Sequence, residues 1–369
     1  MRLGWAQDDN FVMNPPLKPR RPAFIFAVGV TIKFTFMKKN HILVLLALGL
    51  ALTTRGTSGA ADGPYRLLKE IPVGDPSSWD YLSVDEAGRR LYVSHGTEVV
   101  VIDIDKDTVV GKIPNTPRVH GFAVAADLGR GVASNGGENK ASVVDLKTLE
   151  TIVKLDTGTN PDGFCYEPGQ HEVYLFNGGS ASASVINPKD AKVVATIPLG
   201  GKPEFPTADP AAGRVYDNLE DKSAVVVIDT KTHSVVATWP ITGGTGPSGM
   251  AIDTAHHRLF IGCDNKVMAM MDSTTGKVIT TVPIGDGVDA NAFDPGTQYA
   301  FASCGGSGTT TIVHEDSPDK LTLVQTLKTA SGARTMTIDP KTHKIYLSVG
   351  QRNGPANNFK VLVYELQKP

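Results

Sequence analysis

Short apolar runs alternate with polar turns along the chain from residue 65 onward. The runs are four to seven residues long and rich in Val, Ile and Thr, as in LYVSHG (91–96), VVVID (99–103) and AVVVID (224–229). Runs of this length, bounded by turn sequences such as DEAGRR and TKTHS, predict β-strands. No helical periodicity of useful length appears after residue 61, so the pattern indicates an all-β fold.

The runs belong to a repeat. The segment SWDYLSVD (78–85) returns as TPRVHGFAVA, NPDGFCYE, KPEFPTAD, GPSGMAID, GVDANAFD and GARTMTID. We call the residue at the position of Asp80 in each copy the marker residue. The markers are Asp80, His120, Asp162, Glu204, Ser248, Asp289 and Arg334, at intervals of 40, 42, 42, 44, 41 and 45 residues.

Each copy continues in the same way. The second apolar run ends fifteen residues after the marker, and a third and a fourth run follow. Four strands per copy, at a period near 40 residues, are typical of the blades of a β-propeller. The repeat therefore predicts an all-β, seven-bladed propeller in a single domain.

The two ends of the repeat region complement each other. The last copy has only three runs and ends in KVLVYEL (360–366), whereas YRLLKEIPVG (65–74) precedes the first copy and matches the fourth runs VVATIPLG and VITTVPIG. We expect this N-terminal strand to complete the last blade. Closure of this kind removes two exposed sheet edges.

The first sixty-one residues differ from the repeat region. Residues 37–61 combine a basic start, an apolar run over 42–52 and small residues at 58–60, which is the layout of a secretory signal peptide. Residues 1–36 precede it as a gene-start artefact or a disordered leader, and Arg20-Arg21 leaves a long twin-arginine leader open. The predicted organisation is a leader (1–36), a signal peptide (37–61) and a propeller (62–369). The expected location is periplasmic or extracellular.

Charge and composition indicate which classes of partner are not expected. The chain has a net charge of −2 and a pI near 6.5, which gives no signal for nucleic acid. The eleven apolar residues of the signal peptide are too few to span a bilayer, and we expect no membrane span in the mature chain, which we expect to be a monomer. Cys165, Cys263 and Cys304 allow one disulfide at most, so this is not a disulfide-built scaffold.

The marker residues are the candidate site. The first strand of each blade in a propeller lines the central channel, so the markers should form a ring at one mouth. We expect His95, which ends the second run of the first copy, to lie beside Asp80 across the hairpin. The predicted ligand-binding residues are therefore Asp80, His95, His120, Asp162, Glu204, Asp289 and Arg334.

Three of these residues also offer a metal site. Carboxylate and imidazole groups bind divalent ions, and the markers Asp80 and His120 lie on adjacent blades with His95 between them. The candidate cofactor is accordingly a divalent metal ion held by Asp80, His95 and His120. An alternative is that these polar side chains only face the water of a solvated channel mouth.

The repeat resembles a known family. The motifs YVSHG and YLFNG, the IPxG strand ends and the VVVID strands are similar to those of the YVTN-type β-propeller repeat family, the YncE-like exported bacterial propellers. The resemblance covers roughly residues 62–369. The Asn that closes the family signature is present only at Asn135 and Asn177. The resemblance implies a propeller with binding or scaffold uses and assigns no chemistry.

Two functional hypotheses follow. The leading one is an exported, non-enzymatic propeller that binds a small polar ligand or a protein partner at the mouth of its central funnel. The alternative is a metal-dependent, lactonase-like hydrolase or lyase with its site in the same funnel, which rests on analogy of fold. No GxSxG, HExxH, CxxC or Walker pattern occurs in the chain.

The signal peptide makes a direct prediction. Protein expressed from its own start in a secretory host should be cleaved near Ala60 or Ala61, because the apolar run and the small residues after it define a cleavage site. Intact mass and N-terminal sequencing of the exported protein check this. A mature protein that begins at Met1 would contradict it.

Overall fold

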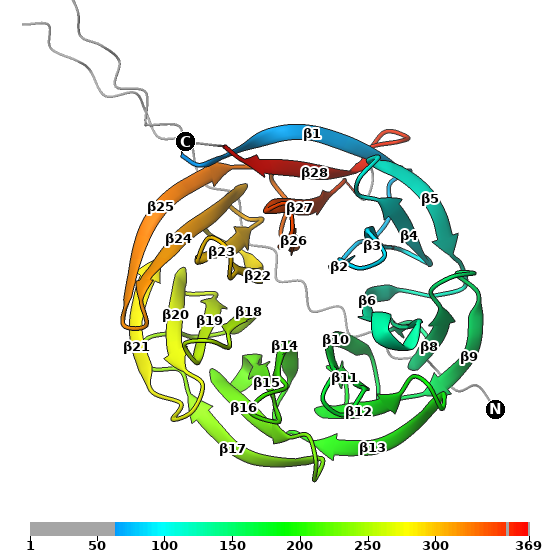
Figure 1. Ribbon diagram of the computed structural model, residues 1–369, viewed down its shortest axis with the longest axis horizontal. Helices are drawn as coiled ribbons and strands as arrows, with labels where there is room; N and C mark the ends of the chain where they lie inside the picture. Colours follow the sequence, from blue (N-terminus) through cyan, green and yellow to red (C-terminus); the bar gives the residue numbers. More distant parts are fainter. Residues whose placement is uncertain (1–62, 352–353, 368–369) are drawn as a thin grey trace, which may run out of the picture. The chain divides into compact units, whose positions relative to one another are not determined.

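The computed structural model describes residues 63–351 and 354–367. Over these residues the chain forms seven four-stranded antiparallel sheets, arranged as blades around a common centre (Figure 1). The predicted seven-bladed propeller is confirmed. The predicted leader and signal peptide lie outside the described residues.

The blades follow one another in chain order, and each runs from the centre to the periphery. Blade 1 contains β2 (Leu82–Asp85), β3 (Arg90–His95), β4 (Glu98–Asp103) and β5 (Thr108–Ile113). Blade 2 contains β6 (Val119–Ala125), β7 (Arg130–Asn135), β8 (Lys140–Asp145) and β9 (Thr151–Asp156). Blade 3 contains β10 (Pro161–Glu167), β11 (Glu172–Asn177), β12 (Ser182–Asn187) and β13 (Lys192–Pro198).

The remaining blades repeat this order. Blade 4 contains β14 (Pro203–Asp209), β15 (Arg214–Leu219), β16 (Ala224–Asp229) and β17 (Ser234–Pro240). Blade 5 contains β18 (Pro247–Asp253), β19 (Arg258–Cys263), β20 (Val267–Asp272) and β21 (Val278–Pro283). Blade 6 contains β22 (Val288–Asp294), β23 (Tyr299–Cys304), β24 (Thr309–Ser317) and β25 (Lys320–Lys328). Blade 7 contains β26 (Met336–Asp339), β27 (Lys344–Val349), β28 (Phe359–Leu366) and β1 (Tyr65–Gly74).

Helical structure is nearly absent from these residues. Two 3₁₀ turns, η1 (Ala126–Leu128) and η2 (Glu220–Lys222), are the helical segments of the described chain. Within the same residues, no helix has the length and hydrophobicity that crossing a membrane requires.

The hydrophobic core lies between neighbouring blades. Second and third strands are buried on both faces, so they carry continuous apolar runs, whereas the fourth strands alternate between exposed and half-buried positions. At the junction of blades 1 and 2, Tyr92 stacks on Phe122 with ring centroids 4.5 Å apart. Each of the seven junctions holds a separate apolar cluster.

The N-terminal strand completes the last blade as expected. In Figure 1, β1 lies beside β28 at the periphery, and the two strands pair antiparallel from Tyr65–Leu366 to Gly74–Phe359. The ring of Tyr65 packs edge-on against Phe301 of blade 6 at 5.4 Å, and its hydroxyl donates to the carbonyl of His343 at 2.9 Å. Tyr65 therefore ties the first strand to blades 6 and 7.

The closure can be tested within β1 itself. Tyr65→Ala should lower the free energy of unfolding by about 3–5 kcal/mol, because it removes a side chain that is only 2% exposed at the seam. The matched control Leu67→Ala, on the same strand but 48% exposed, should cost about 0.5 kcal/mol or less. Urea unfolding of the three proteins gives both values. Equal losses for the two variants would show that β1 does not close the ring.

Candidate functional site

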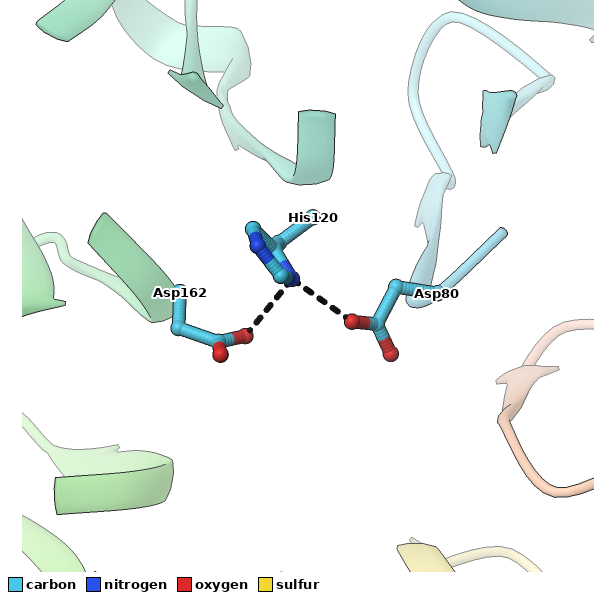
Figure 2. Close-up of side chains that lie close together, drawn as sticks. All are labelled: Asp80, His120 and Asp162. Atoms are coloured by element: carbon cyan, nitrogen blue, oxygen red, sulfur yellow. Dashed lines mark hydrogen bonds and ion pairs between the residues drawn. The ribbon is translucent and has the colours of Figure 1, made fainter. Parts of the chain in front are cut away.

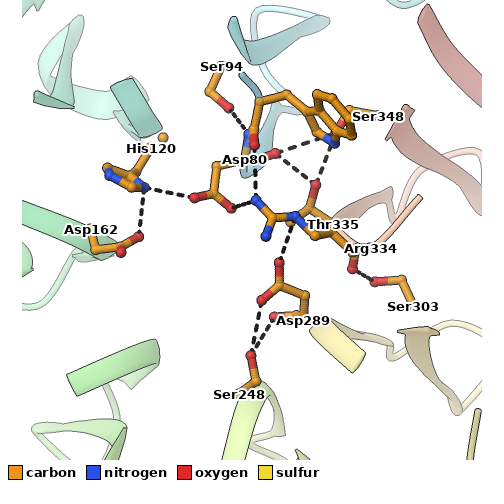
Figure 3. A network of polar contacts seen from close by, with 12 residues as sticks. Asp80, Ser94, His120, Asp162, Ser248, Asp289, Ser303, Arg334, Thr335 and Ser348 are labelled. Atoms are coloured by element: carbon orange, nitrogen blue, oxygen red, sulfur yellow. Dashed lines mark hydrogen bonds and ion pairs between the residues drawn. The ribbon is translucent and has the colours of Figure 1, made fainter. Parts of the chain in front are cut away.

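The marker residues converge at one end of the central channel. They surround a cavity of about 240 Å³. Of the seven residues predicted to bind a ligand, six line it: Asp80, His120, Asp162, Glu204, Asp289 and Arg334. Side chains that sequence reasoning did not select complete the lining: Ser78, Trp79, Arg118, Val119 and Lys202. Figure 3 shows the polar network that joins several of these groups.

A β-bulge explains why the markers face the channel. In blade 2, Asn135 pairs with Val119, the residue before the marker, and regular pairing resumes at Phe122 opposite Ala133. The same shift in register occurs in blades 3 to 6. In blades 2 to 5 the marker and the residue after it thus lie opposite a single residue of the second strand, and in blade 6 Asp289 alone is extra. Bulges re-aim side chains in this way. Because period-two alternation is broken there, a simple cross-strand pairing does not apply.

His95 does not lie where the sequence analysis placed it, since the regular pairing of β2 with β3 begins at Leu82 opposite Val93 and includes neither Asp80 nor His95. Its Nε2 atom is 2.8 Å from the carbonyl oxygen of Asp75, and its Nδ1 is 3.3 Å from Glu98. The ring stacks on Phe359 of blade 7 at 4.7 Å. In blade 1, Asp80 instead uses its backbone N–H to bond the Ser94 hydroxyl, at 2.7 Å. The expected grouping of His95 with Asp80 and His120 is wrong in its geometry.

Asp162 takes the place that His95 was expected to fill. Figure 2 shows the His120 ring between two carboxyl groups. Its Nδ1 lies 2.7 Å from Asp80 Oδ2 and 3.1 Å from Asp162 Oδ1. The three ligand atoms lie within 4.8 Å of one another, so these side chains are the set at this mouth that can hold a metal ion. A hydrogen bond joins Nδ1 to Asp80 Oδ2, and Asp162 Oδ1 faces the same nitrogen.

The charge on His120 is set by its two neighbours. Burial alone would lower the pKa of this ring, but hydrogen bonds to Asp162 and Asp80 outweigh it and raise the pKa to about 10. Burial raises the pKa of Asp80, while the hydrogen bond from His120 and the charge of Arg334 oppose that rise. An imidazolium between two carboxyl groups is the state that this geometry favours at neutral pH.

A glycine makes room for the ring. A Cβ atom on Gly136 would lie 2.6 Å from His120 Nε2, so a larger residue there would collide with the imidazole. The Nε2 atom is buried and has no hydrogen-bond partner among the described residues.

Arg334 plays the corresponding part on the other side of Asp80. Its guanidinium lies 3.4 Å from Asp80 Oδ1 and 3.1 Å from Asp289 Oδ2, and it donates to the carbonyl of Trp79 at 3.0 Å. Asp289 also accepts a hydrogen bond from the Ser248 hydroxyl at 3.1 Å. Two cations, His120 and Arg334, thus link five blades through alternating charges.

Blade 4 has an excess of carboxyl groups. Burial, Asp162 and Asp289 raise the pKa of Glu204 to about 8, although Lys202 lies 3.7 Å away. Burial raises the pKa of Asp289 to about 7 in spite of Arg334. Behind Glu204 lies Asp217, which is fully buried and whose pKa is raised well above its ordinary value by burial and by Glu204. The cation that faces Glu204 is Lys202, whose side chain is 49% exposed and is shared with Glu220.

Buried hydroxyl groups hold the marker backbone in place. The carbonyl of Asp80 accepts from Thr335 Oγ1 at 2.7 Å and from Ser348 at 3.4 Å, and Ser303 donates to the carbonyl of Arg334 (Figure 3). Sequence reasoning missed this group. Its signal is a polar residue just before the end of an otherwise apolar second strand, as in YVS, FAS and YLS.

The channel becomes apolar one residue deeper. Tyr81 packs edge-on against Phe205 at 5.0 Å and Phe164 at 6.0 Å. A second cavity of about 280 Å³ is lined by these rings and by side chains such as Met250, Phe293 and Met336. The aromatic cluster therefore separates the polar mouth from an apolar interior.

The cysteines are not part of the site. Cys263 and Cys304 are free and buried, and burial raises the pKa of the thiols to about 12 and about 11. Cys165 is also a free thiol, packed at the junction of blades 3 and 4.

Comparison with known proteins shows the fold and no more. No family model matches the chain, and no curated protein sequence matches it. Among solved structures, the chain is similar to Kuenenia stuttgartiensis hydrazine synthase, with a TM-score of 0.67 and 18% identity over 83% of this chain and 97% of that one. It is also similar to the WD40 repeats of RRP9, with a TM-score of 0.68 and 13% identity over 82% and 98%. A third similar structure is that of U3-55K, with a TM-score of 0.67 and 12% identity over 81% of this chain and 98% of that one.

The protonated His120 makes a pH-dependent prediction. A pKa raised in the folded state from 6.5 to about 10 stabilises the protein fully below pH 6.5, and this stabilisation disappears as the pH rises to about 10. Relative to His120→Gln, the wild type should therefore be more stable at low pH by on the order of a few kcal/mol, with the difference shrinking through that window. Urea unfolding across the window measures it. A difference that grows with pH would refute the imidazolium.

Proposed function

We propose that this protein is a binding module that takes a small ligand carrying an amine or another organic cation at the polar mouth of its channel. The observation that carries the proposal is the uneven distribution of charge around the cavity. His120 pairs with Asp80 and Asp162, and Arg334 pairs with Asp80 and Asp289, whereas Glu204 has only the half-exposed Lys202 as its ion-pair partner among the described residues. An ammonium group there would meet a carboxyl group that no buried cation neutralises.

Lys202 does not satisfy this side. Its ammonium group is shared with Glu220, and its side chain is 49% exposed, so its charge is screened by solvent. The pKa of Glu204 remains raised to about 8 beside it. A bound cation would favour the ionised carboxylate and so would release a proton on binding at neutral pH.

The cavity is suited to binding. About 240 Å³ matches a small molecule better than a protein surface, and the hydrogen-bonded backbone of the markers holds the polar groups in fixed positions. The signal peptide predicted over residues 37–61 favours a role outside the cytoplasm. The resemblance of the blades to the YVTN-type, YncE-like exported propellers agrees with a binding role.

A metal-dependent hydrolase or lyase is the second candidate function. The observation in its favour is the convergence of Asp80, His120 and Asp162 within 4.8 Å. A divalent ion bound there would have to displace the proton from His120 Nδ1, so its binding would weaken as the pH falls. When bound, such an ion would supply a Lewis acid at the mouth of the channel.

Calorimetry with matched probes tests the proposal. Primary and quaternary amines, their neutral alcohol analogues and simple carboxylates are titrated into the mature protein in buffers of different ionisation enthalpy. We expect amines alone to bind, with release of protons from Glu204. Glu204→Gln should lower amine affinity at least about tenfold, because it removes a charge-assisted hydrogen bond. The matched control Glu138→Gln, which removes a carboxyl that pairs with Lys154 outside the cavity lining, should bind like the wild type.

Two results would reject amine binding. One is the absence of heat and of a thermal shift for every amine tested. The other is equal affinity in the wild type and Glu204→Gln. Binding of Ca²⁺, Mn²⁺ or Zn²⁺ that disappears in Asp162→Asn would instead favour the metal-dependent candidate.

A further inference from the structure

A second cluster of charged side chains lies at the opposite end of the blades, between blades 5 and 6. Ser248 is near the start of β18 and faces the polar mouth, whereas Asp253 ends the same strand and so lies at its far end. Beside Asp253 are His256, in the turn after β18, and Glu315 from β24 of blade 6. Asp253 Oδ2 is 2.5 Å from His256 Nδ1, and Glu315 Oε1 is 3.8 Å from the same atom.

Glu315 occupies a position that other blades give to uncharged residues. In five blades, one residue follows directly after the pairing of the second and third strands. Its backbone N–H donates to a backbone carbonyl in the first hairpin turn, as Glu315 does to Gln298 at 2.9 Å. The residues at this position are all buried, and the other four are Ile104, Leu146, Thr230 and Ser273. A carboxyl group at this buried position is therefore not required by the fold.

The charge balance at this junction also differs from that of the next two. At each of these two junctions, the carboxylate that ends the first strand of one blade pairs with a cation in the first hairpin turn of the next blade. Asp294 pairs with His343 at 2.7 Å, and Asp339 pairs with Arg89 at 2.7 Å. Each cation lies four residues after the carboxylate that ends the first strand of its own blade. The residue at that position in blade 6 is the uncharged Gln298. The junction of blades 5 and 6 thus lacks the fixed cation and has gained a second carboxyl.

Within the described chain, the side chain of Glu315 has no hydrogen bond to compensate for its burial, and its nearest cation-forming group is His256 at 3.8 Å. Glu315 is fully buried, and neither of its carboxyl oxygens has a hydrogen-bond partner among the described residues. The nearby Arg258 is engaged elsewhere, since its guanidinium bonds Asp272 at 2.8 Å and the carbonyl of Pro318. Burial and the carboxyl of Asp253 raise the pKa of Glu315 to about 7. An unpaired buried carboxyl is costly unless a proton or a cation joins it.

We propose that Asp253, His256 and Glu315 form a divalent metal site that joins blades 5 and 6, independent of the site at the polar mouth. Their ligand atoms lie within 4.8 Å of one another. Two carboxylates and one imidazole suit Zn²⁺ or a similar transition ion, which accepts three protein ligands and a water molecule. Ca²⁺ would need six or more oxygen ligands. His256 is 35% exposed in a turn, so it can move aside to admit the ion and leaves the fourth position open to water.

Zn²⁺ titration of the mature protein, after treatment with a chelator, tests the proposal. The wild type is expected to bind Zn²⁺ and to melt at a higher temperature with Zn²⁺ than with chelator, because the ion binds only the folded state. Glu315→Gln and His256→Ala should each bind one equivalent fewer, or bind that equivalent at least about tenfold more weakly. Glu315→Gln in chelator should melt no lower than the wild type, which shows that it is folded.

Two matched variants separate this site from other carboxyl groups. Glu172→Gln removes a buried carboxyl that pairs with His233 between blades 3 and 4, at 2.8 Å, without a second carboxyl. Asp162→Asn removes a ligand from the polar mouth. Both should keep the equivalent that Glu315→Gln loses. A wild type that binds no Zn²⁺ at micromolar concentration would overturn the proposal. So would undiminished binding in both Glu315→Gln and His256→Ala.

Discussion

One imidazole ring, that of His120, allows two carboxyl groups to lie close together in the buried mouth of this propeller. Asp80 and Asp162 project from blades 1 and 3 toward the same point, and two carboxylates so placed would repel each other in a poorly solvated channel. His120 on the blade between them supplies the cation, and Arg334 does the same between Asp80 and Asp289. The alternation of charge around the ring depends on these two residues, since breaking a buried pair leaves an uncompensated charge.

The same rule explains the two places where the protein differs from a uniform repeat. Each blade supplies equivalent positions, and Asp217 and Glu315 are carboxyl groups at buried positions that other blades fill with uncharged residues. At the mouth, the carboxyl groups of Glu204 and the buried Asp217 outnumber the cations that lie near them. Between blades 5 and 6, the buried carboxyl group of Glu315 likewise has no hydrogen-bond partner among the described residues. Both excesses are most simply satisfied by a cation from outside the chain, an organic one at the mouth and a metal ion between the blades.

The fold and most of the mouth were predictable from the sequence because the repeat constrains them. A constant spacing determines the number of blades, the closing strand and the end of the channel at which six of the seven selected residues gather. The error over His95 has a local cause. In blade 1 the regular pairing of the first two strands begins only at Leu82 opposite Val93, and neither the apolar pattern nor the spacing records where that pairing begins. The contact of Asp162 with His120 and the contacts that Glu315 makes across the blade junction depend on the distances between blades. A sequence does not contain these distances.

The protonation state of His120 tests the account most directly. The ring nitrogens of ¹⁵N-labelled histidine report by NMR whether one or both carry a proton, and Gly136 and the two carboxyl groups make the environment of this ring distinct from that of the other histidines. The account predicts an imidazolium that persists through neutral pH and loses its proton only toward the value of about 10. A neutral ring at pH 7, titrating near the ordinary value of 6.5, would contradict the charge arrangement on which the proposed site depends.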